Sequence, residues 1–167
     1  MLRRIRLKHP IFHLLTISAF KYMVDNGHFF KCKKGNNVYK EDQPARANIY
    51  FVMFGQIEFR SSKTDPKGRF GETMSLGWTL GEEILYAEDS EQIYRKEDSV
   101  SINDSCMLQV SIDDLVTMSS QRATIGGGGT LTKDYQILLS FLEKNFEVKS
   151  EWRIESKLIE RKAEESD

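Results

Sequence analysis

The chain has 167 residues, which suits one domain of ordinary size. Its composition is 40% hydrophobic and 29% charged, which excludes a disordered or fibrous protein and leaves enough apolar material for a core. Its 24 basic and 25 acidic residues give a net charge of −1, so no whole-chain electrostatic argument favours binding to nucleic acid or to a membrane.

Cysteine content and hydropathy indicate the cellular compartment in which the protein is expected. Cys32 and Cys106 are too few for a disulfide framework or a zinc site, and they suit a reducing compartment. No run of apolar residues approaches the roughly 18 that a transmembrane helix needs. We therefore expect an intracellular, cytoplasmic protein without a transmembrane segment. The first acidic residue is Asp25, and this basic start resembles a transit peptide, so a mitochondrial location is the alternative.

The first predicted element is a helix over residues 10–26. Pro10 is tolerated in the first turn of a helix, where its missing N–H costs nothing. Asn26 and Gly27 end the pattern. The residues that share one face of this helix are Ile11, Leu14, Leu15, Ser18 and Tyr22.

Short strands separated by turns are predicted from Phe29 to about Val110. The segment 49–54 consists almost entirely of strand-forming residues, and Cys106 to Val110 is the last strand. The turn signals between strands are Lys34 to Asn37, Asp42 to Pro44 and Asp65 to Gly68.

Helices return after the strands. Ser111 and Asp114 form a capping pattern for a short helix, and the four glycines at 126–129 form a linker. An amphipathic helix is predicted from Thr132, and the tail from Lys149 onward is predicted to be solvated or to contact a partner. The apolar stripe of this helix consists of Tyr135, Leu138, Leu139, Leu142 and Phe146. We expect it to pack on the chain's own strands.

Three segments follow from these elements. Residues 1–30 form a basic arm and helix, residues 31–120 a strand-rich domain with a short helix after it, and residues 121–167 the linker, amphipathic helix and charged tail.

No motif in the sequence requires an enzyme. The four glycines are not followed by the Gly-Lys-Ser/Thr of a phosphate loop. His9 and His13 are four residues apart, which suits a metal, but no carboxylate or cysteine ligand is near, and a capping or partly buried pair is the simpler interpretation. Glu82 and Glu83 are adjacent and point in different directions on a helix. We predict a non-catalytic protein with no metal and no required cofactor.

The stretch from Lys34 to Glu58 resembles the first strands of the cyclic nucleotide-binding domain family, which includes kinase regulatory subunits and catabolite activator proteins. The resemblance rests on the Lys-Gly turn at 34–35 and on the pattern of apolar residues, Gly55 and Glu58 in Ile49-Tyr-Phe-Val-Met-Phe-Gly-Gln-Ile-Glu58. Leu80-Gly81-Glu82 stands where the family has Phe-Gly-Glu. The resemblance extends from about His9 to Ser120 and implies an α+β, mainly β fold, an eight-stranded antiparallel jelly-roll-like β-roll flanked by N-terminal and C-terminal helices.

The resemblance also implies a nucleotide site. By position, Gly81 allows close approach of the backbone and Glu82 accepts a hydrogen bond from the ribose, while an arginine binds the phosphate. The residues that would contact the nucleotide are Gly81, Glu82, Glu83, Ile84, Leu85, Arg95, Lys96 and Ser99. The candidate lid residues, which would stack on the base, are Tyr135, Phe141 and Trp152.

The sequence departs from the family at the arginine. Counting back from Ser99 places Lys96 at the arginine position and Arg95 one residue before it, and the segment between Gly81 and Arg95 is longer than the motif. Glu97 and Asp98 stand where the family has small neutral residues. A carboxylate ~4 Å from a phosphate opposes binding by about 1 to 4 kcal/mol, depending on the dielectric.

Gly81 and Glu82 match the family's nucleotide site, whereas the segment around Arg95 departs from it, so two functions are considered. The first is a regulatory or assembly module, a scaffold for protein–protein interaction, that binds other protein subunits through its terminal helices. The alternative is a sensor of cAMP or cGMP that signals to a partner chain through its C-terminal helices. Neither function requires nucleic acid.

Overall fold

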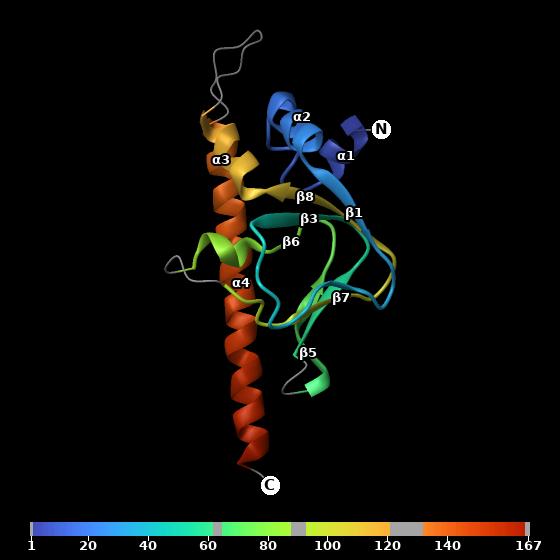
Figure 1. Cartoon of the computed structure of the whole chain (residues 1–167), viewed down its shortest axis with the longest axis vertical. Helices are drawn as coiled ribbons and strands as arrows, with labels where there is room; N and C mark the ends of the chain where they lie inside the picture. The colour runs from blue at the N-terminus through green and yellow to red at the C-terminus, as the bar shows by residue number, and fades with distance from the viewer. Residues whose placement is uncertain (1, 62–64, 88–92, 121–131, 166–167) are drawn as a thin grey trace.

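Eight strands form two four-stranded antiparallel sheets, and helices lie at one end and along one side of them (Figure 1). The computed structural model describes residues 2–61, 65–87, 93–120 and 132–165. The first sheet has the order β1 (His28–Cys32), β8 (Ser105–Ser111), β3 (Asn48–Phe54) and β6 (Thr79–Leu80). The second has the order β2 (Asn37–Tyr39), β7 (Asp98–Ser101), β4 (Ile57–Ser61) and β5 (Asp65–Met74). The predicted eight-stranded antiparallel β-roll, flanked by N-terminal and C-terminal helices, is confirmed.

The helices are α1 (Leu2–Lys8), α2 (Ile17–Asn26), the short 3-10 helix η1 (Glu82–Leu85), α3 (Ile112–Ser120) and α4 (Thr132–Glu164). As predicted, Ser111 caps α3: its hydroxyl accepts a hydrogen bond from the Asp114 backbone N–H at 3.0 Å. None of the described helices combines the length and the apolar character needed to cross a bilayer. The glycine linker at 126–129 lies outside the described residues, as do Glu88, Asp89 and Glu91.

The predicted helix over residues 10–26 is wrong in its first half. Residues 10–15 form turns, α2 begins only at Ile17, and Thr16 is its N-cap, with the hydroxyl accepting from the Ala19 backbone N–H at 3.2 Å. Asp134 of α4 binds both the backbone N–H and the hydroxyl of Thr16, each at 2.8 Å. Leu14, predicted to share a face with Ile11 and Leu15, is 55% exposed, whereas those two residues are buried. A capping threonine bound by a distant carboxylate therefore sets the start of α2.

The alternating side chains of β3 separate two hydrophobic clusters. Ile49 and Phe51 lie in the helix-side cluster, which includes Phe12, Leu108 and Leu142. Tyr50 and Val52 lie in the roll interior, the cluster between the two sheets, together with Phe59, Leu80 and Met107. This division follows from the period of two along a strand.

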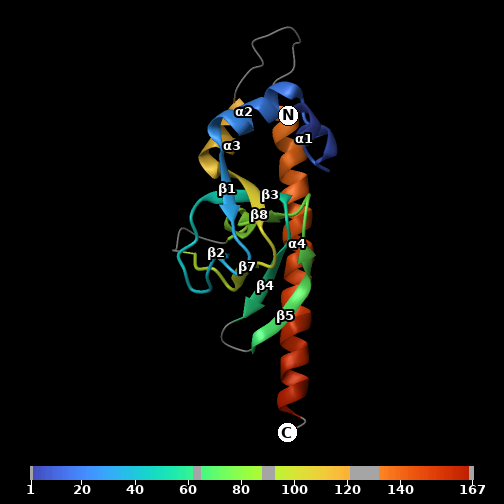
Figure 2. The same cartoon turned by 90° about the vertical axis from the view of Figure 1, so that its right-hand side faces the viewer.

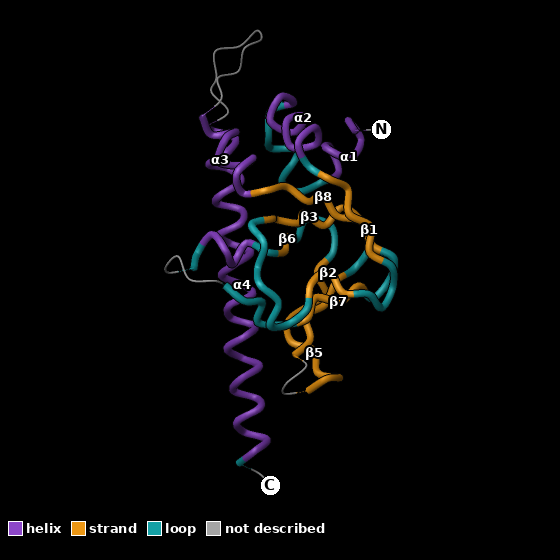
Figure 3. The backbone as a smooth tube through the Cα atoms, in the orientation of Figure 1, coloured by secondary structure: helices purple, strands orange, loops and turns teal. Residues whose placement is uncertain are grey.

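Helix α4 contacts both clusters because it runs along the whole roll, as Figures 2 and 3 show from two sides. Leu138 and Leu142 are buried in the helix-side cluster, and Trp152 packs against the roll interior. The prediction of a solvated tail from Lys149 onward is wrong for the first turns of that segment. Lys149 is 1% exposed, whereas Ile154 and Leu158 further along are 60% and 50% exposed.

Candidate functional site

The site begins at Gly81, where strand β6 turns into η1. Gly81 has φ +90° and ψ −1°, a left-handed conformation that glycine adopts without strain. A Cβ atom at this position would lie 2.5 Å from the Asn48 carbonyl oxygen and about 3.4 Å from the Arg95 guanidinium. Gly81 therefore permits the close contact that brings η1 against Asn48 at the start of β3.

Substituting Gly81 with alanine tests that contact. We expect Gly81→Ala to lower the free energy of unfolding by about 3 kcal/mol, because the left-handed backbone and the collision with Asn48 both oppose a Cβ atom. Gly35 is a matched control, since its φ is +82° and nothing lies within 4 Å of its added Cβ. Gly35→Ala is expected to cost only about 1 kcal/mol. If urea denaturation gave the same loss in the free energy of unfolding for both variants, the contact with Asn48 would contribute nothing to the cost of Gly81→Ala.

Glu82 points into the roll interior and pairs with a lysine from the far end of the chain. The Lys149 ammonium group on α4 donates to one carboxylate oxygen of Glu82 and to the Thr79 carbonyl. Both side chains are 1% exposed. One turn earlier on α4, the Asn145 amide donates to the Thr79 hydroxyl at 3.0 Å. Helix α4 is thus fixed to β6 and η1 by a buried polar row.

Arg95 is buried beside η1 and pairs with the second glutamate of that helix. Backbone hydrogen bonds to Gln43 at 2.8 Å and from Asp42 at 2.9 Å hold the main chain of Arg95. Its guanidinium pairs with the Glu83 carboxylate and lies 4.3 Å above the centre of the Tyr39 ring. Arg95 is 3% exposed. Its position beside Gly81 places a fixed positive charge at the start of η1.

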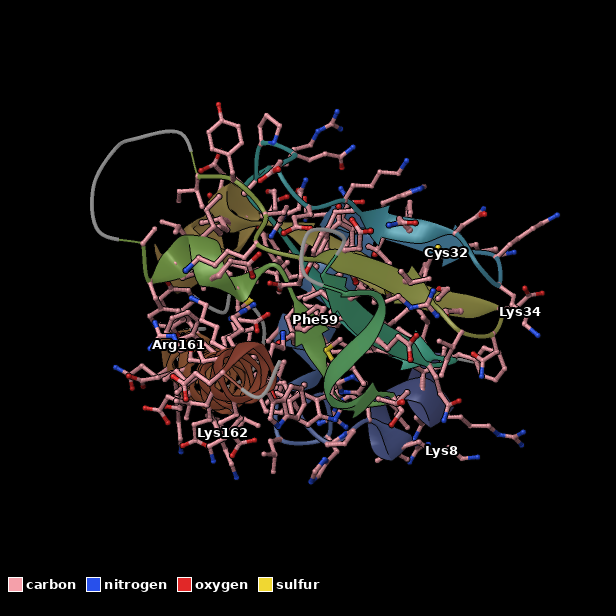
Figure 4. All side chains as sticks on the ribbon, turned by 90° about the horizontal axis from the view of Figure 1, so that it is seen from below. Lys8, Cys32, Lys34, Phe59, Arg161 and Lys162 are labelled. Atoms are coloured by element: carbon pink, nitrogen blue, oxygen red, sulfur yellow. The ribbon has the colours of Figure 1, made fainter. Side chains whose placement is uncertain are left out.

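A third ion pair joins α4 to the segment before β7. Arg153 binds Glu97 with two hydrogen bonds, at 2.6 and 3.2 Å, in the bidentate geometry that arginine favours with carboxylates. The charged ends of Arg153 and Lys149 lie 5.6 and 5.5 Å from the centre of the Phe59 ring. Figure 4 shows Phe59 in the middle of the molecule. Two cations of α4 therefore reach a buried aromatic ring inside the roll.

Among the described residues, the charges named above form three ion pairs inside the roll. Three cations, Lys149, Arg95 and Arg153, pair with three carboxylates, Glu82, Glu83 and Glu97. Several buried polar atoms near them have no hydrogen-bond partner among the described residues: the second carboxylate oxygen of Glu82 and the hydroxyls of Tyr39, Ser99 and Ser101. The roll interior is therefore polar on one side and apolar on the other.

Burial and neighbouring charges shift the pKa values of these groups in opposite directions. Burial is the largest influence on Glu82 and raises the pKa of its carboxyl, although Lys149 opposes it. Burial also acts to raise the pKa of Glu83, but Arg95 and Lys149 together hold it below its usual value. For Tyr39, burial followed by the nearby carboxylates raises the pKa well above the ordinary value.

The structure brings only part of the predicted site together. Gly81, Glu82, Glu83, Arg95 and Ser99 all surround the polar part of the roll interior, whereas Lys96 is exposed. Leu85 packs on the helix-side cluster, and Ile84 is half-buried. Among the candidate lid residues, Tyr135 and Phe141 pack on the helix-side cluster, and Trp152 packs on the roll interior, with its ring 5.1 Å from that of Trp78.

Sequence reasoning missed Lys149 and Arg153 as members of the site and treated Glu97 only as an obstacle to a ligand. A signal was present: Asn145, Lys149 and Arg153 follow each other at intervals of four, which places them on one face of a helix. That face continues from the apolar stripe toward the roll.

The predicted histidine pair has a structural role at His9. Its Nδ1 atom accepts from the backbone N–H groups of Ile11 and Phe12 at 3.3 and 3.4 Å, and its ring stacks on Phe12 with 4.0 Å between centres. Within the described ranges, no group of three or more His, Cys, Asp or Glu side chains is arranged to hold a metal.

Comparison with known proteins identifies the fold. The sequence matches no family model and no curated protein. A structure described as a cyclic nucleotide-binding protein from Geobacter metallireducens GS-15 has a TM-score of 0.60 at 15% identity, with 86% of this chain and 93% of that chain covered. The c-di-GMP responsive global regulator CLP of Xanthomonas campestris also has a TM-score of 0.60, at 14% identity, with 90% and 63% covered.

The sensor domain of the transcriptional regulator DNR from Pseudomonas aeruginosa has a TM-score of 0.57 at 14% identity, with 92% of this chain and 88% of that chain covered. The three descriptions name a cyclic nucleotide-binding protein, a c-di-GMP responsive regulator and the sensor domain of a transcriptional regulator. The chain therefore has the fold of the cyclic nucleotide-binding domain, and the resemblance noted in the sequence is confirmed at the level of the fold.

Proposed function

We propose that this chain is a non-catalytic regulatory or assembly module in which helix α4 takes the place of a nucleotide. The observation that carries the proposal is the buried pair between Lys149 and Glu82. By the resemblance, Glu82 is the residue that would accept a hydrogen bond from the ribose. Here one of its carboxylate oxygens already accepts from Lys149 inside the same chain.

The two other ion pairs support the same function. The Arg95 guanidinium, which a phosphate would need, is already paired with Glu83. Glu97 is held inside the roll by its ion pair with Arg153. A nucleotide would have to displace carboxylates from buried cations and would itself bring a negative charge near Glu97. Displacing a buried, hydrogen-bonded partner leaves an uncompensated charge, which is strongly unfavourable.

In this function the module works through its outer surfaces, and other protein subunits are the expected partners. The part of α4 beyond the roll carries Ile154 and Leu158, both at least half exposed. That segment is the candidate for partner contact, because the earlier part of the predicted tail packs on the roll.

Isothermal titration with cAMP and with cGMP tests the proposal. We expect no saturable binding to the full chain tighter than about 100 μM, which corresponds to about 5.5 kcal/mol of binding free energy. Binding below about 10 μM that disappears in Arg95→Ala but persists in Lys40→Ala, a change at an exposed cation, would contradict the proposal.

One observation favours the alternative, a sensor of cAMP or cGMP. Arg95 is buried beside Gly81 at the start of η1, and its partner Glu83 lies on the same short helix, so a phosphate could replace that carboxylate. The variant Glu83→Gln separates the two functions. A sensor would bind nucleotide more tightly once the competing carboxylate is neutral, whereas a module closed by α4 would still show no saturable binding.

A further inference from the structure

Exposed aliphatic side chains are concentrated in the first seventeen residues. Among the described residues, Ile17 has the largest exposed fraction of any large hydrophobic side chain, 71%. Leu2, Leu7 and Leu14 are 45%, 59% and 55% exposed. Single exposed apolar residues are ordinary, but four within one short segment require an explanation.

Basic side chains are interleaved with these aliphatic ones. Arg3, Arg4 and Lys8 are exposed on α1, beside Leu7. The first acidic residue in the sequence is Asp25, and it pairs with Lys21 on α2. The carboxylate that reaches this end of the chain from α4, Asp134, is bound to Thr16. Neither of these two carboxylates therefore neutralises an exposed cation of α1.

The segment is fixed in place by contacts from its inner side. The Arg6 guanidinium donates to the carbonyls of Leu15 and His13, which ties α1 to the turn that carries Leu14. Ile5 packs against the helix-side cluster. Both Figure 1 and Figure 2 place α1 and α2 at the end of the molecule opposite the C-terminus of α4. The exposed cations and aliphatic side chains thus belong to one preformed end of the molecule.

We propose that α1, the turn after it and Ile17 at the start of α2 form a docking surface for an anionic lipid membrane. Long aliphatic residues alternating with Lys and Arg match the boundary between acyl chains and negatively charged headgroups, where apolar area and charge contribute together. An acidic protein would supply charge complementarity as well. The aliphatic side chains are nevertheless distributed over α1, the turn after it and the first residue of α2. This distribution suits shallow insertion into a fluid layer better than binding in a shaped pocket.

The proposed docking surface does not depend on whether the chain binds a cyclic nucleotide. It lies at the helical end of the molecule and uses none of the ion pairs inside the roll. Membrane docking would place the roll and the exposed part of α4 on the side away from the lipid, where they remain accessible to a partner protein.

Vesicle sedimentation with the full chain tests the proposal. Each cation near an anionic surface strengthens binding by about 5-fold, so three should favour vesicles of 70% phosphatidylcholine and 30% phosphatidylserine over pure phosphatidylcholine by about 100-fold. The preference should decrease as salt is raised from 50 to 500 mM, because the charges are exposed. This salt dependence is measured on the unmodified protein and does not depend on the folding of a variant.

Two triple variants identify the surface. The change Arg3→Gln, Arg4→Gln and Lys8→Gln should remove the preference for phosphatidylserine. The matched change Lys33→Gln, Lys34→Gln and Lys40→Gln alters three exposed lysines of the β1–β2 region and should retain it. Figure 4 shows Lys34 at the edge of the strands and Lys8 on α1, away from Lys34. Replacing Leu7 and Ile17 with Gln should weaken binding to both kinds of vesicle by about 10-fold.

Three results would overturn the proposal: no binding to phosphatidylserine vesicles at 50 mM salt, equal binding to both vesicle types, or equal losses in the two triple variants. Binding of an acidic protein to this surface in the absence of any vesicle binding would assign it to a protein partner instead.

Discussion

Replacing Lys149 with alanine is expected to lower the free energy of unfolding by about 3 to 5 kcal/mol. The substitution leaves the Glu82 carboxylate buried without its cation and leaves the Thr79 carbonyl without its donor. Because domains of this size have total stabilities of about 5 to 15 kcal/mol, the loss would be a large part of the whole. Urea denaturation followed by circular dichroism measures it.

A control on the same helix separates the ion pair from helix propensity. Lys144 is exposed on α4, so Lys144→Ala should change the stability by less than about 0.5 kcal/mol. The double variant Lys149→Met with Glu82→Gln removes both charges and should recover most of the loss, since a neutral pair of similar volume avoids the unpaired charge. A Lys149→Ala variant as stable as Lys144→Ala would show that the buried pair contributes nothing.

Acidification is expected to destabilise the protein through His9 by up to about 3 kcal/mol. Burial lowers the pKa of His9 from 6.5 to about 4, with nearby His13 adding to the effect and a backbone contact with Val52 opposing it. Between pH 6.5 and about 4, His9 therefore binds a proton in the unfolded chain but not in the folded chain. The contribution of neutral His9 to the free energy of unfolding is fully present above pH 6.5 and is lost as the pH falls to about 4.

The effect is measured as the urea midpoint between pH 7 and 4.5. His9→Asn removes the titrating group but keeps a short acceptor for the Ile11 and Phe12 backbone, so the dependence on pH should become weaker in this window. His28→Asn, a change at an exposed histidine, should retain the wild-type dependence. A His9→Asn variant with the same slope as wild type would assign the acid sensitivity to other groups.

Local signals in the sequence predicted most of the strands. The turn at Lys34 and Gly35, the apolar run at 49–54 and the cap at Ser111 each depend on neighbouring residues, and the structure contains each of them. Gly81, Glu82 and Arg95 were also named in advance, but from the family resemblance: Leu80-Gly81-Glu82 stands where the family has Phe-Gly-Glu, and Arg95 lies within one residue of the family's arginine. Contacts that are decided locally are thus accessible from sequence.

The parts that could not be predicted depend on partners far away in the chain. Lys149 and Arg153 lie in a segment dominated by charge, and such a segment is normally solvated because burying an unpaired charge is costly. Only the positions of Glu82 and Glu97 make their burial favourable, and no local pattern relates these residues. The start of α2 is similar, because it depends on a bond between Thr16 and Asp134.

The separation of the paired charges along the chain has a consequence for the order of folding. Glu82 and Lys149 are 67 residues apart, and Glu97 and Arg153 are 56 residues apart. During synthesis at about 5 to 20 residues per second, the carboxylates precede their cations by several seconds. Throughout that interval the strands can approach each other, but closing the roll would bury carboxylates that have no counter-charge. We therefore expect folding to be completed only when α4 has been made, so that an interrupted chain stays open and accessible to proteases.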